Sequence, residues 1–152
     1  MTNRSVAHAK FSLERHYDVS PTTVFAAWAD PKAKARWFAG PLAAHQLEFR
    51  VGGREVVHAV QDDGTALVFE SVYRDIVDGE RVLYSSTLSA GGTVVTVSVT
   101  TVELSLDGNG SRLYLTEYGA FLDSYEQPSI REQGTAGWLD ALGAELKSAP
   151  SG

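Results

Sequence analysis

The 152-residue sequence contains no cysteine, which excludes a disulfide framework, a zinc–thiolate site, an iron–sulfur cluster and a cysteine nucleophile. Positive charge is scarce, because 13 Lys and Arg stand against 19 Asp and Glu, for a net charge of −6. A basic surface for nucleic acid or for an anionic membrane is therefore not expected. No apolar run approaches the ~20 residues that span a bilayer, and no signal peptide is recognisable. We expect a cytoplasmic protein that neither binds nucleic acid nor inserts into a membrane.

The composition that remains is typical of a globular protein, with 43% hydrophobic and 21% charged residues. A chain of this length buries roughly 68–70% of its unfolded surface on folding, so it can hold a core without disulfides or a metal. No internal repeat or linker divides it. The prediction is one domain over residues 1–152, with frayed tails at 1–9 and 148–152.

The N-terminal part predicts one strand and two short helices. Partial alternation of apolar and polar residues indicates a strand from about Lys10 to Val19. Ser20-Pro21 and Asp30-Pro31 each combine an N-cap residue with proline at the first helical position. These signals predict helices over 21–29 and 31–38, the second ending at Gly40-Pro41. The basic residues 32, 34 and 36 are expected on the solvated face of that second helix.

The middle of the chain predicts an antiparallel meander. Turn signals rich in glycine and aspartate fall at 52–53, 62–64, 78–79, 91–92 and 107–110. They separate expected strands near 42–51, 54–61, 66–77, 80–89, 93–106 and 111–119. Val95, Val97 and Val99 alternate in one parity and Val102 in the other, which predicts a bulge near Thr100-Thr101.

The C-terminal part predicts a long helix from Ile130 to Lys147. Ser129 and Glu132 have the spacing of a capping box, and Trp138, Leu142 and Leu146 lie on one apolar stripe. Because a single stripe must be buried against something, the economical arrangement is a sheet wrapped around the helix. The predicted fold is therefore α+β of the helix-grip type, a curved antiparallel sheet of about seven strands around the C-terminal helix.

Five segments in order resemble the activator of heat-shock-protein-90 ATPase homologue family, within the START-like SRPBCC superfamily. They are residues 24–31, 36–38, 50–54, 72–82 and 132–142. The resemblance implies the helix-grip fold and an internal cavity. The sequence resembles the C-terminal-type domain of the eukaryotic activator without its client-binding domain. It departs from the family pattern at Val51 (usually proline), Glu55 (usually aromatic) and Ser71 (commonly glycine).

A set of mostly aromatic residues falls on the elements that a helix grip brings together. The candidates for ligand binding are Trp37, Phe69, Ser71, Tyr73, Tyr84 and Trp138. Ligand cavities are mainly apolar and aromatic with a few polar groups, so these residues predict a small apolar ligand between the C-terminal helix and the sheet. The open alternative is that the same residues form an ordinary packed core.

Two histidines are candidates for a polar group in this cavity. His58 shares strand parity with Val56 and Val60, which predicts that it faces the apolar side of the sheet. His45 shares parity with Leu47 in the same way. Each could instead be a core histidine whose hydrogen bonds are satisfied.

Glu117 is the candidate carboxylate, since it shares parity with Leu113 and Leu115. Burial raises the pKa of a carboxyl group, which would suit a general acid or base. Alternatively Glu117 is exposed, or it pairs with Arg54.

Three functions stay open at this point. The first is binding of a small hydrophobic molecule. The second is an enzyme of the cyclase, dehydratase or hydrolase type that uses His58, Glu117 or Arg54 as catalytic residues. The third is a co-chaperone-like activator of heat-shock protein 90. No metal-binding or cofactor signature is recognised, and a homodimer is left open.

Overall fold

A computed structural model describes residues 4–148, so the tails predicted at 1–3 and 149–152 lie outside the described residues. The chain order is β1 (Val6–Tyr17), α1 (Pro21–Ala29), α2 (Pro31–Lys34), a π-helical turn η1 (Ala35–Ala39), β2 (Ala44–Leu47), β3 (Arg54–Val60), β4 (Ala66–Val77), β5 (Arg81–Ala90), β6 (Thr93–Asp107), β7 (Gly110–Leu122) and α3 (Pro128–Ser148).

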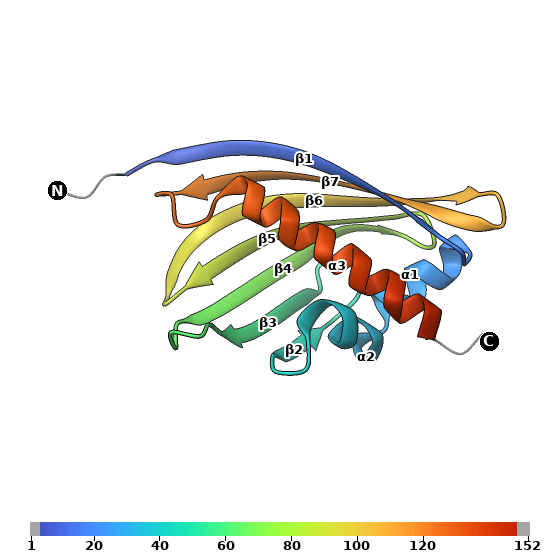
Figure 1. Ribbon diagram of the computed structural model, residues 1–152, viewed down its shortest axis with the longest axis horizontal. Coiled ribbons are helices and arrows are strands. Elements are labelled where there is room, and N and C mark those ends of the chain that lie inside the picture. Colours follow the sequence, from blue (N-terminus) through green and yellow to red (C-terminus); the bar gives the residue numbers. More distant parts are fainter. Residues whose placement is uncertain (1–3, 149–152) are drawn as a thin grey trace.

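The strands form one antiparallel sheet in the order β1-β7-β6-β5-β4-β3-β2. Figure 1 shows the curved sheet with α3 lying across its concave face, and α1 and α2 near the C-terminal end of α3. Neighbouring strands follow each other in the chain except β1, which crosses the molecule to pair with β7. The predicted helix-grip fold is confirmed.

Several boundaries differ from the sequence prediction. β1 begins at Val6, so residues 6–9 are paired with β7 and are not a frayed tail. β2 covers only Ala44–Leu47, and residues 48–53 turn the chain into β3 instead of extending the strand. Ser20 and Asp30 cap α1 and α2 as predicted. Ser129 lies inside α3, which starts at Pro128, so the predicted capping box is wrong.

The predicted bulge at Thr100-Thr101 is also wrong. Both residues stay in regular register with β5 and β7. The register shift lies earlier, where Leu88 pairs with Thr96 and Ser89 with Val94, so that Val95 is the extra residue. Because the strand is regular there, Val97 and Val99 lie on its outer face and Val102 lies on its inner face, where Thr96, Ser98 and Thr100 precede it.

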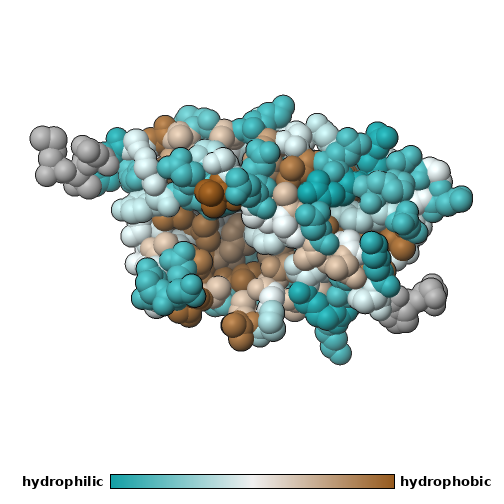
Figure 2. All heavy atoms as spheres, in the orientation of Figure 1, coloured by the Kyte–Doolittle hydropathy of each residue, from teal (hydrophilic) through white to brown (hydrophobic). Residues whose placement is uncertain are grey.

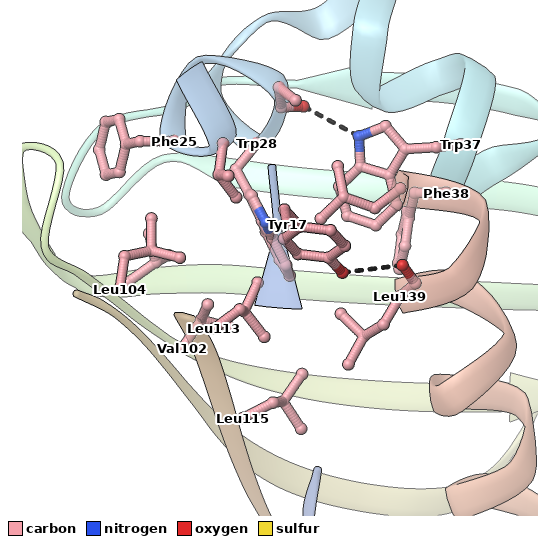
Figure 3. Packing of buried hydrophobic residues seen from close by; sticks show 14 of the residues in the cluster. Tyr17, Phe25, Trp28, Trp37, Phe38, Val102, Leu104, Leu113, Leu115 and Leu139 are labelled. Carbon is pink, nitrogen blue, oxygen red and sulfur yellow. Dashed lines mark hydrogen bonds between the residues drawn. The ribbon is translucent and has the colours of Figure 1, made fainter. Parts of the chain in front are cut away.

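The apolar core lies between α1, α3 and the sheet, as Figure 3 shows. The buried stripe of α3 consists of Leu139, Leu142 and Leu146, whereas Trp138 is half-buried, which corrects the predicted stripe. Tyr17 donates a hydrogen bond of 2.8 Å to the backbone oxygen of Leu139. A Cβ added to Gly143 would lie 3.3 Å from the Tyr17 ring, so glycine allows the helix to approach the end of β1 closely.

Candidate functional site

The side chains on the concave face form rows that run across the strands. The middle row, here called the serine row, consists of Glu55, Ser71, Ser86, Ser98 and Gly119. On one side of it lie Tyr73, Tyr84, Thr100 and Glu117. On the other side lie Val57, Phe69, Leu88, Thr96 and Phe121. Three serines and a glycine thus lie between rows that contain tyrosine, phenylalanine and leucine, and the three serines are buried.

Figure 2 shows a hollow beside α3, over the inner faces of β4 and β5, with hydrophobic residues on its floor. Phe38, Phe69 and Trp138 form an aromatic cluster that joins η1, β4 and α3. The ring centroid of Trp138 lies 4.4 Å from that of Phe38 and 6.0 Å from that of Phe69. Phe69 and Trp138 are half-buried, which leaves part of both side chains accessible.

The serine row keeps hydrogen-bonding capacity in this apolar setting. The hydroxyl oxygens of Ser71 and Ser86 lie 2.7 Å apart, and both side chains are buried. Their mutual bond uses one of the two hydroxyl hydrogens and leaves the other without an assigned acceptor. Both hydroxyls are shielded from solvent, since Ser71 is 0% and Ser86 is 3% exposed.

A buried ionic group, here called the Lys34 cluster, closes one end of the serine row and contains Lys34, His45, Glu55 and Tyr73. The ammonium of Lys34 donates to Oε1 of Glu55 at 2.7 Å. The Tyr73 hydroxyl donates to the same oxygen at 3.0 Å, and Nε2 of His45 lies 2.7 Å from Oε2. Lys34 and Glu55 are completely buried.

Burial and charge act in opposite directions on the Lys34 cluster. Burial lowers the pKa of Lys34, although the neighbouring Glu55 carboxylate partly opposes this. For Glu55, burial raises the pKa, but the charge of Lys34 and the hydrogen bonds from His45 and Lys34 outweigh it, so the pKa lies below its ordinary value. Burial, with the Glu55 charge, raises the pKa of the Tyr73 hydroxyl. Glu55 is therefore an ionised hydrogen-bond acceptor.

Aromatic rings surround the Lys34 ammonium. Five ring centroids lie 4.6–5.8 Å from Nζ, and they belong to Trp28, Trp37, Phe38, Tyr73 and Tyr84. Such cation–π contacts stabilise a desolvated cation by about 2 kcal/mol. Trp37 also donates from Nε1 to the Ala27 oxygen, as Figure 3 shows. Among the predicted ligand-binding residues, Trp37, Tyr73 and Tyr84 are thus buried around Lys34. Phe69 and Ser71 lie on the inner face of β4, and Trp138 lies on α3.

A second buried group, here called the Arg131 cluster, joins the first turns of α3 to β6 and β7. Nη1 of Arg131 donates to Glu117 at 3.0 Å, and Nη2 lies 2.9 Å from Glu126. The other Glu117 oxygen accepts from Thr100 at 2.8 Å, and Thr96 donates to Glu126 at 2.7 Å. Both Glu117 oxygens are therefore engaged, and the sequence alternative that Glu117 pairs with Arg54 is wrong.

Two other candidates lie on the outer face of the sheet. His58 is exposed, because Glu55, Val57 and Ala59 are the residues of β3 that turn inward. Arg54 is exposed as well and forms an ion pair with Glu70. The prediction that His58 faces the apolar side is wrong, and the three proposed catalytic residues do not meet.

Sequence reasoning missed Lys34, Glu55 and Arg131 as interior residues. A usable signal exists for Lys34, since Trp37 and Phe38 follow it at i+3 and i+4 and so share its helical face. His45, in contrast, faces inward with Leu47, as its parity predicts.

A separate groove of about 1260 Å³ lies on the outside, where the end of β1 and α1 meet the C-terminal half of α3. Its walls include Arg15, Asp140 and Lys147. Within residues 4–148, no group of three or more acidic, cysteine or histidine residues is arranged to hold a metal ion. None of the helices described is long and apolar enough to cross a membrane.

Residues 18–149 match the family model described as activator of Hsp90 ATPase homolog 1-like protein. The chain belongs to this family. Glu55 and Ser71 are register partners on the concave face. No curated protein matches the chain.

Solved structures of similar proteins agree with this family membership. An uncharacterised protein from Rhizobium leguminosarum is 35% identical, with a TM-score of 0.94 over 97% of this chain and 100% of that one. Protein Mll3558 from Rhizobium loti is 41% identical, with a TM-score of 0.88 over 93% of this chain and 99% of that one. Ara h 8.0201 is 16% identical, with a TM-score of 0.75 over 94% and 100% of the two chains, which shows a shared fold.

Proposed function

We propose that this protein binds a small, mainly apolar molecule between α3 and the concave face of the sheet. The observation that carries the proposal is the serine row, whose small side chains lie under α3 beside a hollow with apolar walls. A ligand there would lie against Phe69 and Trp138 and could use a serine hydroxyl as a polar contact. The helix-grip fold and the acidic composition are compatible with a cytoplasmic ligand-binding protein.

A bulky side chain in the serine row should fill the proposed site. We expect the neutral fluorescent probe N-phenyl-1-naphthylamine to bind the wild type, and Ser71→Leu to weaken that binding about tenfold or more, which corresponds to ~1.4 kcal/mol. The reason is steric, because Ser71 is completely buried on the inner face of β4, between Glu55 and Ser86. Fluorescence titration measures the affinity, and urea denaturation checks that the variant still folds.

The matched control is Ser105→Leu, the same substitution at an exposed position of β6. This variant should bind the probe as the wild type does. A wild type that does not bind the probe, together with a large loss of stability in Ser71→Leu, would show that the interior is packed solid.

A second candidate function is binding to heat-shock protein 90, which the family description supports. The observation that favours it is an apolar patch on the outer face of the sheet, where Val97, Val99 and Tyr118 are 45%, 43% and 55% exposed. Val99 and Tyr118 are register partners on β6 and β7. Exposed apolar side chains that cluster on one face are typical of protein-binding surfaces.

If this patch contacts the chaperone, the protein should raise the chaperone's ATPase rate, and Val99→Glu should weaken the apparent affinity about tenfold. Val60→Glu is the control, since Val60 is 72% exposed on β3 outside the patch. Absence of stimulation by the wild type would count against this candidate and leave ligand binding unaffected.

A further inference from the structure

The imidazole of His45 lies at the edge of the Lys34 cluster, and only one of its two nitrogens contacts Glu55. Nε2 of His45 lies 2.7 Å from a Glu55 oxygen, and the ionised carboxylate can only accept a hydrogen bond. Nε2 must therefore carry a hydrogen. In a neutral imidazole, the other nitrogen, Nδ1, then presents a lone pair and acts as an acceptor.

The His45 side chain is only 5% exposed, so its surroundings hold little water. An acceptor in an almost enclosed setting gives a hydrogen bond more weight than one at an open surface.

His45 lies in the same cross-strand row as Phe69. His45 pairs with Val57, and Val57 pairs with Phe69, so the three stand side by side on the concave face. Two strand spacings of about 4.8 Å separate the backbones of His45 and Phe69, and a two-ring molecule is large enough to bridge that distance. Phe69 belongs to the aromatic cluster with Phe38 and Trp138, whose rings meet at steep angles of 59° and 64°. Aromatic rings pair well with a further ring in an offset or edge-to-face arrangement, and a flat aromatic ligand can supply such a ring.

We propose that the hollow selects flat aromatic molecules that carry a hydroxyl group, which donates a hydrogen bond to Nδ1 of His45. This inference rests on the proposed function and adds to it the chemical class of the ligand. Glu55 acts as a positioning residue, because its carboxylate keeps the hydrogen on Nε2. Lys34 in turn keeps Glu55 ionised.

The test compares 2-naphthol with 2-methoxynaphthalene, which has the same rings but no hydroxyl hydrogen. Isothermal titration calorimetry should show that the wild type binds 2-naphthol about tenfold more tightly, as one buried hydrogen bond allows. In His45→Phe the two affinities should be equal, because the acceptor is gone. His58→Phe is the control on the outer face and should keep the difference.

Nuclear magnetic resonance of the wild type, labelled with ¹⁵N, gives a second measurement that needs no altered protein to bind. The Nδ1 resonance of His45 should be that of an unprotonated nitrogen, and 2-naphthol should shift it while 2-methoxynaphthalene should not. The His45→Phe spectrum assigns the resonance.

The outcomes separate the two proposals. If both compounds bind the wild type equally, or if Nδ1 already carries a hydrogen, the inference about His45 is overturned and ligand binding stands. The same holds if the difference persists in a folded His45→Phe variant. If neither compound binds, the inference and the proposed apolar site fall together.

Discussion

Replacing Lys34 with methionine should lower the free energy of unfolding by about 3–5 kcal/mol, the cost typical of removing one partner of a buried ion pair. The substitution preserves volume and apolar contact with the surrounding rings, so the loss arises from the Glu55 carboxylate left in the interior. Urea denaturation with an unchanged m-value measures the effect. Lys32→Met, on the exposed side of α2, is the matched control and should change little.

A double variant separates charge from packing. Lys34→Met combined with Glu55→Gln should recover most of the lost stability, because well-packed neutral groups often replace a buried ion pair without loss. If the double variant is as unstable as Lys34→Met alone, the shape of the lysine side chain matters rather than its charge.

The same pair gives a pH dependence with a definite sign. The pKa of Glu55 is lowered in the folded protein, so its contribution to stability is present above its ordinary pKa and is lost as the pH falls through the folded value. The pKa of Lys34 is also lowered, so the unfolded chain binds this proton more tightly and stability rises with pH between the lowered and the ordinary value. The double variant should lack both slopes in denaturation measured from acid to alkaline pH.

Arg131→Met should also lower the free energy of unfolding by about 3–5 kcal/mol. Arg131 is the cation that stands between Glu117 and Glu126, and its side chain is 6% exposed. Without it, the carboxylates of Glu117, buried on β7, and of Glu126, just before α3, are left without their cation. The expected consequence is loosening of the first turns of α3, which hydrogen exchange of their amides can follow.

The matched control for this variant is Arg36→Met. Arg36 forms a two-pronged ion pair with Glu145, yet its side chain is 59% exposed, so water screens the pair. We expect little change in stability from this substitution. A loss equal to that of Arg131→Met would mean that burial is not what makes the Arg131 cluster important.

The sequence was sufficient for the fold because glycine–aspartate turns and proline-started helices are local signals. Gly91-Gly92, for example, follows the end of β5 as expected. Ser20-Pro21 marks the start of α1 in the same way. The last residue of a strand is harder to predict. β2 ends earlier than expected because residues 48–53 form backbone hydrogen bonds to β3 and β4.

The errors inside the site have one physical cause. The prediction assumed that valines mark the inner face, but Val56, Val97 and Val99 lie on the outer face. Polar residues such as Glu55 and Ser98 lie inside instead, where partners from other elements satisfy them. Parity alone cannot show this inversion, because the partner of Glu55 is on α2 and the partner of Glu117 is on α3.

The pairing of β1 with β7 has a consequence for synthesis on the ribosome. The first strand to emerge has no partner in the sheet until the last strand has been made, about 100 residues later, which at typical elongation rates takes roughly 5–20 s. During that interval the hairpins from β2 to β6 can form, while β1 waits as an unpaired segment. Closure of the sheet is thus a late step that joins its first strand to its last.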